Sequence, residues 1–476
     1  MKKGSQHEFF IEKLKFPAVG IAQKDGIKVF IKNSVPGQKI KGQITKKRNG
    51  YAEAKIVEII ENVNYATEPL CPHFNLCGGC NFQFIPYNIQ VELKKQQVLD
   101  LFEESSIKGF KFLGIEKSPE EFHYRNKMEF TFGDEQKGGS LTLGMHMRGK
   151  SFGIVNVDKC KIVDEDFTVI LNEIVTYFRK KGLPYYRIRS HRGYLRNVVI
   201  RRGKNTGEIL VNIVTTSQID FDFNEITEIL RNLNYNGKLV GVLHTINDNL
   251  SDVVKIDSVK ILFGNDYIIE EILGLKFKIY PESFFQTNSK GTEKLYSIIK
   301  DFLKDTSSKT VFDLYCGTGT IAQILSPHVK KVLGIELVEE AIKSAKENIK
   351  LNGIENCTFI AGDVLHIMKT LEDKPDIIIL DPPRPGINPK AIRQIINFNA
   401  PEIIYVSCNP KTLVNDLNIF IQCGYILDKV KLMDMFPHTA HVETIVSLHR
   451  PAAITHSGLS PSSYDPYMAH KIKGKA

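Results

Sequence analysis

The second half of the chain alternates short apolar runs with amphipathic helical segments, and this alternation constrains the fold more than any other feature. After Pro281 come the apolar runs VFDLY, KVLGIEL, CTFIA, DIIIL and EIIYVS, and most of them are followed by a helical segment. This repetition predicts a doubly wound, Rossmann-like α/β sheet with parallel strands. The last two runs, YILDKVKLMDMF and HVETIVSLHR, have no helix between them, so one antiparallel edge strand is expected.

The residues before this region predict further domains, because 476 residues exceed the usual size of one domain. Residues 1–66 contain short strands broken by glycine turns, typical of an OB-like β-barrel with a basic turn at 46–48. They hold thirteen Lys and Arg against six Asp and Glu, whereas the whole chain has a net charge of +9. This concentration favours an anionic partner such as RNA, although a merely Lys-rich surface remains the alternative.

The remaining boundaries follow from changes in pattern. Residues 67–279 mix strands and helices and predict an α+β central domain, in which the helical segment 88–104 is expected to pack on the catalytic domain. The α/β domain then spans 280–450, and 451–476, rich in Ser, Pro, Gly and Lys, is expected to be a flexible tail. No apolar run is long enough to cross a membrane and none resembles a signal peptide, so a cytoplasmic protein without membrane contact is expected.

A glycine turn follows the first strand of the α/β region. Gly317 and Gly319 allow a ligand to approach the backbone at a helix N-terminus, and Glu336 ends the next strand, where it suits ribose hydroxyls. The turn also satisfies the dinucleotide pattern G-x-G-x-x-A, so by itself it leaves a nicotinamide cofactor open. Asp313 ahead of the glycines, and the DPPR and SCNP motifs at later strand ends, favour S-adenosylmethionine.

The SCNP and DPPR motifs predict a reaction centre. Cys408 follows an apolar strand, at the sheet edge that faces the ligand crevice in open α/β folds, and its polar neighbours favour a reactive thiol over a core cysteine. Asp381 and Arg384 follow the neighbouring strand, where a structural salt bridge between them is the alternative. A thiolate that adds to C6 of uracil activates C5 for methylation, and a base must then remove the C5 proton. Glu443, in HVETI, is the candidate base, although it would also suit the outward face of an edge strand.

The motifs FFQTN, DLYCGTGT, ILDPPRPG, SCNP and HVETI, in this order, resemble the RNA 5-methyluridine methyltransferases, over about residues 10–450. The resemblance implies that Cys408 is the nucleophile and Glu443 the general base, with Asp381 and Arg384 in the same site. Together with the glycine turn, it gives these expected contacts to S-adenosylmethionine: Gln286, Tyr315, Gly317, Gly319, Glu336 and Asp381. Asp363, at the end of the third strand, is expected near the adenine by its position.

A cysteine cluster separates the branches of that family. Cys71, Cys77 and Cys80, with Cys160 downstream, resemble the four ligands of the [4Fe–4S] cluster in the 23S rRNA branch, although by count alone they would equally suit zinc. The N-terminal barrel is similar to the TRAM type of RNA-binding domain. The resemblance therefore implies a partner of 23S rRNA, and we expect a monomer.

A second basic segment lies in the central domain. Residues 187–204 contain seven Lys and Arg and no acid, with Tyr186 and Tyr194 as candidate stacking surfaces, which suits RNA phosphates. A solvated hairpin is the alternative. The segment 124–127 also resembles a part of the family near the RNA.

Three other functions compete with rRNA uridine methylation. The first is a tRNA uridine-C5 methyltransferase. The second is an RNA cytosine-C5 methyltransferase, but that family expects Pro-Cys where this chain has Pro-Pro-Arg384. The third is an inactive RNA-binding iron–sulfur or zinc protein, which would have no need of Cys408 and Glu443.

Overall fold

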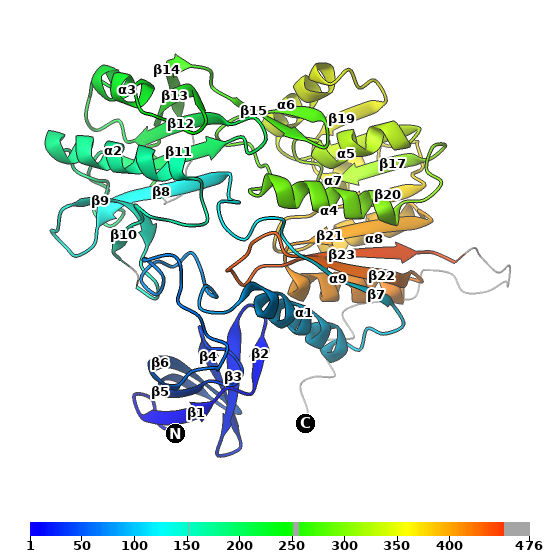
Figure 1. Ribbon diagram of the computed structural model, residues 1–476. Coiled ribbons are helices and arrows are strands. Elements are labelled where there is room, and N and C mark those ends of the chain that lie inside the picture. The colour runs from blue at the N-terminus through cyan, green and yellow to red at the C-terminus, as the bar shows by residue number, and fades with distance from the viewer. Residues whose placement is uncertain (151, 251–256, 452–476) are drawn as a thin grey trace.

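The computed structural model describes residues 1–150, 152–250 and 257–451, and in these ranges the chain is built on sheets of six, seven and eight strands. Figure 1 shows the N-terminal six-stranded sheet at the lower left, the central seven-stranded sheet above it and the eight-stranded sheet at the right. A two-stranded sheet, β15 (Ile268–Ile272) and β16 (Leu275–Ile279), precedes the first helix of the α/β part. None of the described helices is long and apolar enough to span a membrane.

The N-terminal sheet has the strand order β1-β5-β6-β4-β3-β2 and encloses a core of alternating aliphatic side chains that includes Val29, Ile31 and Ile40. The basic residues 46–48, expected in a turn, continue strand β5, and Lys46 pairs with Glu53 on β6 at 3.0 Å. The six strands are β1 (Gln6–Phe10), β2 (Lys13–Lys15), β3 (Val19–Lys24), β4 (Ile27–Lys32), β5 (Lys39–Arg48) and β6 (Tyr51–Glu61).

The central sheet has the order β10-β9-β8-β11-β12-β13-β14 and carries helices α2 and α3 on one face. Helix α2 begins after the capping side chain of Asp164 and ends at Gly182, whose φ of 66° suits glycine. The elements are β8 (Lys127–Asp134), β9 (Leu141–His146), β10 (Ile154–Asn156), α2 (Glu165–Lys181), β11 (Leu195–Arg202), β12 (Glu208–Thr215), α3 (Asn224–Arg231), β13 (Lys238–Ile246) and β14 (Ser258–Gly264).

The predicted parallel α/β sheet is confirmed, with the strand order β19-β18-β17-β20-β21-β23-β22-β7. The chain winds outward from β17 in both directions, so the switch point, where ligands bind in such sheets, lies between β17 and β20. The elements are α4 (Ser289–Phe302), β17 (Thr310–Leu314), α5 (Thr320–Leu325), β18 (Lys331–Glu336), α6 (Glu339–Leu351), β19 (Cys357–Ala361), α7 (Val364–Ile367), β20 (Ile377–Leu380), α8 (Pro389–Asn397), β21 (Glu402–Ser407), α9 (Pro410–Gln422), β22 (Ile426–Met433) and β23 (Glu443–His449), with a short 3₁₀ turn at Ser326–His328.

The antiparallel strand of the α/β sheet does not lie at the edge, where it was expected. Strand β23 is antiparallel to its neighbours, as expected, but it lies between β21 and β22 rather than at the edge. The edge is β7 (Lys111–Glu116), which pairs parallel to β22 although it comes from the region that we expected in the central domain. A candidate base at the start of β23 is therefore enclosed by strands on both sides.

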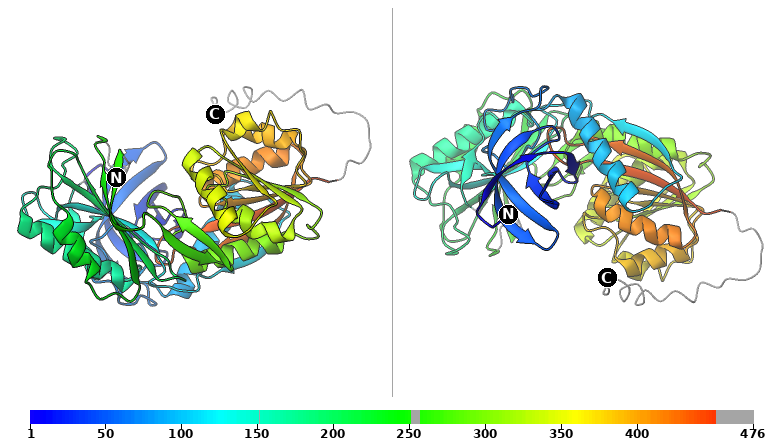
Figure 2. Two further views of the ribbon diagram at one scale, coloured as in Figure 1. Left: turned by 90° about the horizontal axis from the view of Figure 1, so that it is seen from above. Right: turned by 90° about the horizontal axis from the view of Figure 1, so that it is seen from below.

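Helix α1 (Tyr87–Glu104) joins the barrel, the cysteine segment and the α/β sheet, and Figure 2 shows it along the face of that sheet. Its Val98, Leu101 and Phe102 belong to the same core as Leu413 of α9. Lys94, fully buried, forms an ion pair of 2.7 Å with buried Asp434, just after β22.

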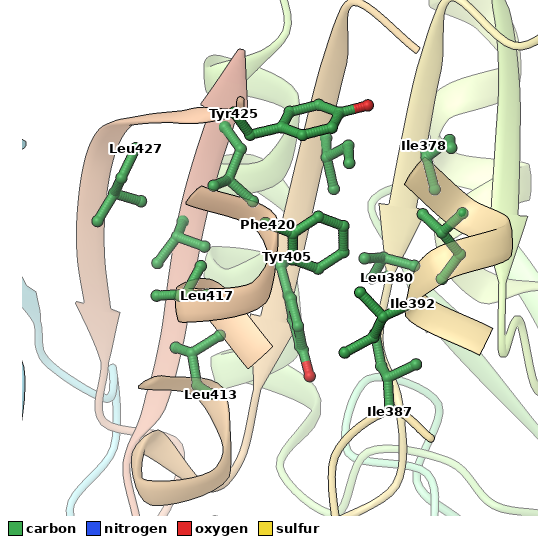
Figure 3. Packing of buried hydrophobic residues seen from close by; sticks show 14 of the residues in the cluster. Ile378, Leu380, Ile387, Ile392, Tyr405, Leu413, Leu417, Phe420, Tyr425 and Leu427 are labelled. Atoms are coloured by element: carbon green, nitrogen blue, oxygen red, sulfur yellow. The ribbon is translucent and has the colours of Figure 1, made fainter. Parts of the chain in front are cut away.

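The core beneath α8 and α9 fixes the ends of β20 and β21. Figure 3 shows Leu417 and Phe420 of α9 packed beside Tyr405 of β21. The Tyr405 hydroxyl donates a 2.6 Å hydrogen bond to Asp416, which also accepts the Ile387 N–H of the loop after β20. Strand β21 and the loop after β20 are thus held by one buried carboxylate.

Candidate active site

The glycine turn after β17 leaves its backbone open to a ligand. Gly317 has a φ of 54° and nothing within 4 Å of the position that a Cβ would take, so space is free in front of the turn. Gly319, with a φ of 72°, lies so close to the Phe359 ring that an added Cβ would come within 2.5 Å of it. Both positions favour glycine because of their positive φ, and at Gly317 the missing side chain also leaves the backbone accessible to a ligand.

Glu336 at the end of β18 is fixed by backbone donors. Its carboxylate accepts hydrogen bonds from the N–H of Gly317 at 3.1 Å and from that of Val338 at 3.0 Å. The side chain is partly exposed beside the open turn. Its position suits an acceptor for the hydroxyl groups of a ribose.

Two further predicted contacts lie at the same edge of the sheet. Tyr315 has a φ of 68°, and burial, followed by the charge of Asp363, raises the pKa of its hydroxyl to about 12. Asp363 itself is exposed and accepts the Leu365 N–H at 2.7 Å as the cap of α7.

Asp313, which precedes the turn, is completely buried. Burial, followed by the charge of Asp381, raises its pKa to about 8. Its Oδ2 accepts the Ala322 N–H at 3.1 Å, whereas its Oδ1 has no protein partner among the described residues. Buried polar atoms are rarely left unpaired, so a bound ligand or water is the fitting partner. The open turn and Glu336 thus lie side by side at the ends of β17 and β18, with the unpaired Asp313 Oδ1 buried behind them.

Gln286 is held by Asn126, which belongs to the segment 124–127 that resembles a part of the family near the RNA. Asn126 is buried, and its Nδ2 donates to the Gln286 carbonyl at 3.0 Å, while its backbone N–H donates to Thr287 at 2.9 Å. Asn288 caps α4 through the Gly291 N–H at 2.8 Å. The segment that carries Gln286 is therefore fixed from both sides. No local signal in the sequence indicates this role of Asn126.

The reaction centre is formed by the ends of two paired strands. Ser407, the last residue of β21, lies opposite Thr444 in the antiparallel register with β23. The next residue outward on each strand is Cys408 on one side and Glu443 on the other, so the sheet brings the two together. Asp381 follows β20, the other neighbour of β21.

The pKa shifts of Cys408, Glu443 and Asp381 are consistent with their positions at these strand ends. Burial raises the pKa of the Cys408 thiol to about 12, the carboxylates of Glu443 and Asp381 add to the increase, and Arg384 opposes it. Burial, then Asp381, raises the pKa of Glu443 to about 8, and burial raises that of Asp381 to about 7. Glu443 is only 4% exposed, which excludes the outward-facing alternative. The site thus holds a neutral thiol beside two carboxyl groups that titrate near neutral pH.

Arg384 lies on an exposed loop tied to the cysteine loop. Its carbonyl accepts hydrogen bonds from Asn409 Nδ2 at 3.1 Å and from Thr412 Oγ1 at 3.3 Å. In the ranges that the structure describes, no ion pair between Arg384 and Asp381 is recorded, in contrast to the structural alternative. The guanidinium is therefore available to a substrate.

The four clustered cysteines line one pocket, although no regular element carries the first three. Gly79 N–H donates to Cys77 Sγ at 3.3 Å, and Gln83 Nε2 donates to Cys80 Sγ at 3.4 Å. Arg148 bonds to the carbonyls of Cys77 and Cys80 and so ties the segment to the central sheet. The pocket is lined by Cys71, His73, Phe74, Cys77, Gly79, Cys80, Gln83, Met128, Met145, Val157, Cys160 and Ile162.

The thiols of this pocket influence one another. Burial raises the pKa of Cys80 to about 12 and that of Cys160 to about 11, and neighbouring cysteines add to both increases. Among the described residues, however, no three His, Cys, Asp or Glu side chains converge as the ligands of one metal ion do. The structure thus brings the predicted ligands to one pocket without showing a metal-binding group.

The basic segment 187–204 contributes less to the surface than predicted. Tyr186 and Tyr194 are buried, so the expectation that they stack with bases is wrong. Arg196 donates to the carbonyl of Asn247 at 2.9 Å, and Arg201 to that of Pro281 at 3.1 Å; both side chains lie inside the fold. Arg187, Arg189 and Arg192 at the tip of the segment remain exposed.

The chain is similar to known proteins over most of its length. The model of the family described as tRNA (uracil-5-)-methyltransferase matches residues 86–451. A Clostridium tetani protein described as an uncharacterized RNA methyltransferase is 59% identical over 450 residues, which cover 94% of this chain and 99% of the relative. A Halalkalibacterium halodurans protein of the same description is 34% identical over 457 residues, covering 94% and 98%.

One solved structure shares the whole arrangement. The tRNA (uracil-54, C5)-methyltransferase of Pyrococcus abyssi, in complex with S-adenosyl-L-homocysteine, matches with a TM-score of 0.74 and 24% identity, over 93% of this chain and 99% of that chain. This likeness confirms the α/β methyltransferase fold. With the extent of the family match and the identity to the Clostridium tetani relative, it leads to one conclusion: the chain belongs to the tRNA (uracil-5-)-methyltransferase family and is an S-adenosylmethionine-dependent RNA (uracil-5-)-methyltransferase.

Proposed function

We propose that the chain methylates C5 of a specific uridine in 23S rRNA through a covalent adduct of Cys408. The observation that carries this proposal is the register of β21 and β23, which sets Cys408 beside Glu443 at the edge that also carries Asp381. A nucleophile and a base at one strand edge are the two groups that this chemistry needs.

The proposed steps use these two residues in turn. The Cys408 thiol gives its proton to solvent and Sγ bonds to C6 of the uracil, so the ring becomes an enolate whose negative charge is shared by O4 and C5. Arg384, whose charge lowers the thiol pKa, favours the reacting thiolate. S-adenosylmethionine, when bound, would supply the electrophilic methyl group, whose bond to the sulfonium sulfur breaks as the bond to C5 forms and leaves a neutral thioether. Glu443 then removes the C5 proton. The released electron pair re-forms the C5–C6 double bond as the bond to Sγ breaks, which returns Cys408.

We propose that the adenosyl end lies against the glycine turn. Gly317 and Gly319 give the backbone access that the adenosyl group needs, and Glu336, oriented by two N–H donors, would accept the ribose hydroxyls. Asp363 and Tyr315 would border the adenine. Gln286 and Asp381 would contact the methionine part, and Asp381 connects it to the reaction centre.

We propose a [4Fe–4S] cluster on Cys71, Cys77, Cys80 and Cys160, with zinc as the alternative. The pocket of four thiols and the N–H donors to two of the sulfurs support it. A cluster binds each thiolate to a different iron, so its ligands need not converge as they do on one zinc ion. Methyl transfer moves no single electrons, so the proposed role is to hold the segment and to position RNA.

The RNA target has a second candidate. The cysteine pocket favours 23S rRNA, whereas the solved structure with the shared architecture is described as a tRNA uridine-54 enzyme. Mapping 5-methyluridine in the rRNA and tRNA of cells with and without this gene decides between them. A site lost only from 23S rRNA would support the proposal, and a site lost only from tRNA would overturn its rRNA part.

The division of labour along the chain follows from this proposal. Residues 1–66 would bind RNA as a TRAM-like barrel, 67–279 would carry the cluster, 280–450 would perform the methylation, and the tail 451–476, outside the described residues apart from 451, receives no role. We propose that the protein acts as a monomer in the cytoplasm. The exposed Arg187, Arg189 and Arg192 would contact phosphates.

A further inference from the structure

The loop 434–442 joins β22 to β23 and leads directly into Glu443. Its contacts come from residues far earlier in the chain. Lys94 Nζ on α1 donates to Asp434 at 2.7 Å and to the Phe436 carbonyl at 2.9 Å, and the Tyr124 hydroxyl donates to the Pro437 carbonyl at 3.0 Å. The first half of the loop is therefore held by α1 and by the start of the central sheet.

The cysteine segment binds the centre of this loop. The backbone N–H groups of Asn81 and Phe82 both donate to the His438 carbonyl, at 2.7 and 3.0 Å. Asn81 directly follows Cys80 in the chain. One carbonyl of the loop thus receives two hydrogen bonds from the residues next to a predicted cluster ligand.

The His438 side chain also has contacts, from Gln90 and Phe122. Gln90 accepts the His438 N–H at 2.9 Å and donates to the imidazole Nδ1 at 3.1 Å. The Phe122 ring stacks on the imidazole at 4.3 Å between centroids. Burial lowers the pKa of His438 to about 4, so the ring is neutral at physiological pH and its Nδ1 can accept the bond from Gln90.

The backbone of His438 is strained in a way that these contacts explain. Its φ is 65°, in the left-handed region that is uncommon outside glycine, although Asn, Asp and His adopt it more often than other residues. Such a conformation persists where the surroundings over-determine it, and such residues cluster at functional sites. At His438 the surroundings are α1, the cysteine segment and Phe122, and the next strand begins with Glu443.

We propose that His438 is a positioning residue that transmits the placement of the cysteine segment and α1 to Glu443. This inference rests on the proposed function, in which Glu443 is the base that releases the product. Cys408 is held separately, by β21 and by the capping side chain of Asn409 on α9. A disturbed His438 therefore affects release of the methylated RNA more than formation of the adduct.

Two substitutions separate the backbone from the ring. His438→Val removes the imidazole and disfavours the left-handed backbone, because a β-branched residue is an outlier there, whereas His438→Asn removes the imidazole and tolerates that backbone. His244→Gln is the control. This histidine of the central sheet stacks on Phe223 at 4.1 Å, has a pKa lowered to about 4 by burial, and lies outside the loop.

The experiment measures formation and release of the covalent adduct with the full-length protein, S-adenosylmethionine, and RNA from cells that lack the gene. We expect His438→Val to form the adduct at nearly the wild-type rate and to release it roughly tenfold more slowly, so that the methylated adduct accumulates. His438→Asn should show a smaller delay and His244→Gln none. Wild-type release by His438→Val, or an equal loss of both steps, would overturn the inference.

If His438→Val does not fold, Gln90→Leu provides the same test, because it removes both bonds to His438 and leaves the loop sequence intact. Accumulation of the adduct supports the inference, and wild-type release overturns it. RNA that contains 5-fluorouridine separates this result from a failure of the proposed function. If the wild-type protein forms no adduct with that RNA, the proposed function and the inference about His438 both fail. If it forms the adduct, and His438→Val releases methylated uridine-containing RNA at the wild-type rate, only the inference about His438 fails.

Discussion

The two thiol sites of this chain are similar in burial and differ in their neighbours. Burial raises the pKa of Cys408 and that of Cys80 to about 12. Cys408 is surrounded by two carboxyl groups and a guanidinium, whereas Cys80 has other thiols and an amide donor around it. The first set can move protons and stabilise a transient thiolate. The second would suit the proposed metal centre, so the neighbours, and not the cysteine itself, separate the two proposed roles.

The largest expected effect removes the reacting thiol. Cys408→Ala should lower methylation by roughly 10⁴-fold or more, since the covalent route is lost. It should also prevent the covalent adduct with 5-fluorouridine-containing RNA, measured on denaturing gels. The cysteine pocket should be unaffected, with unchanged iron content. An adduct in this variant would contradict the assignment of the nucleophile.

Glu443→Gln tests the neighbour instead of the thiol. We expect turnover to fall by roughly 10²- to 10⁴-fold, because the amide cannot take the C5 proton. The adduct should still form with uridine-containing RNA and should accumulate, in contrast to Cys408→Ala. Normal turnover would remove Glu443 as the base.

A substitution in the cysteine pocket should abolish the metal cluster and leave adduct formation intact, the reverse of Cys408→Ala. Anaerobically purified protein should show broad visible absorbance from thiolate-to-iron charge transfer and about four irons per chain. Cys80→Ser should lose this absorbance and lower the melting temperature by about 5–10 °C, while Cys408 keeps its ability to form an adduct. Stoichiometric zinc in the wild-type protein would refute the iron–sulfur cluster.

The features of the active site and of the basic segment differ in how well the sequence predicts them. The α/β strands and the glycine turn are predictable because each depends on neighbouring residues, and the strand-end position of Cys408 follows from them. The nearness of Glu443 to Cys408 depends on the pairing of β21 with β23, which forms only when the chain folds and has no local signal in the sequence. From the sequence, the arginines of the segment 187–204 are expected at the surface. Arg196 and Arg201 are nevertheless buried, because their guanidinium groups bond to carbonyls more than fifty residues away in the chain.

The role of Asn126 shows the same limit, because its partner Gln286 lies 160 residues further along the chain. Asn126→Ala leaves the Gln286 segment without its side-chain donor, at a cost of about 1–3 kcal/mol. We therefore expect the KM for S-adenosylmethionine to rise roughly tenfold, with kcat changed less. Asn197→Ala, at another buried asparagine of the central sheet, is the control and should leave this KM unchanged.

The last expected effect, similar in size, concerns the two carboxyl groups beside Cys408, which act on its thiol pKa. Burial raises the pKa of Asp381 to about 7 and, with the charge of Asp381, that of Glu443 to about 8, so both are mainly neutral at pH 6 and mainly ionised above pH 8. The sulfonium of S-adenosylmethionine is positive and gains from that ionisation, whereas the thioether of S-adenosylhomocysteine is neutral. The preference for the sulfonium should therefore rise roughly tenfold between pH 6 and pH 9, measured by calorimetry with both ligands. Asp381→Asn should flatten this dependence more than Cys80→Ser does; an equal pH response of the two ligands would show that the carboxyl groups do not face the sulfonium.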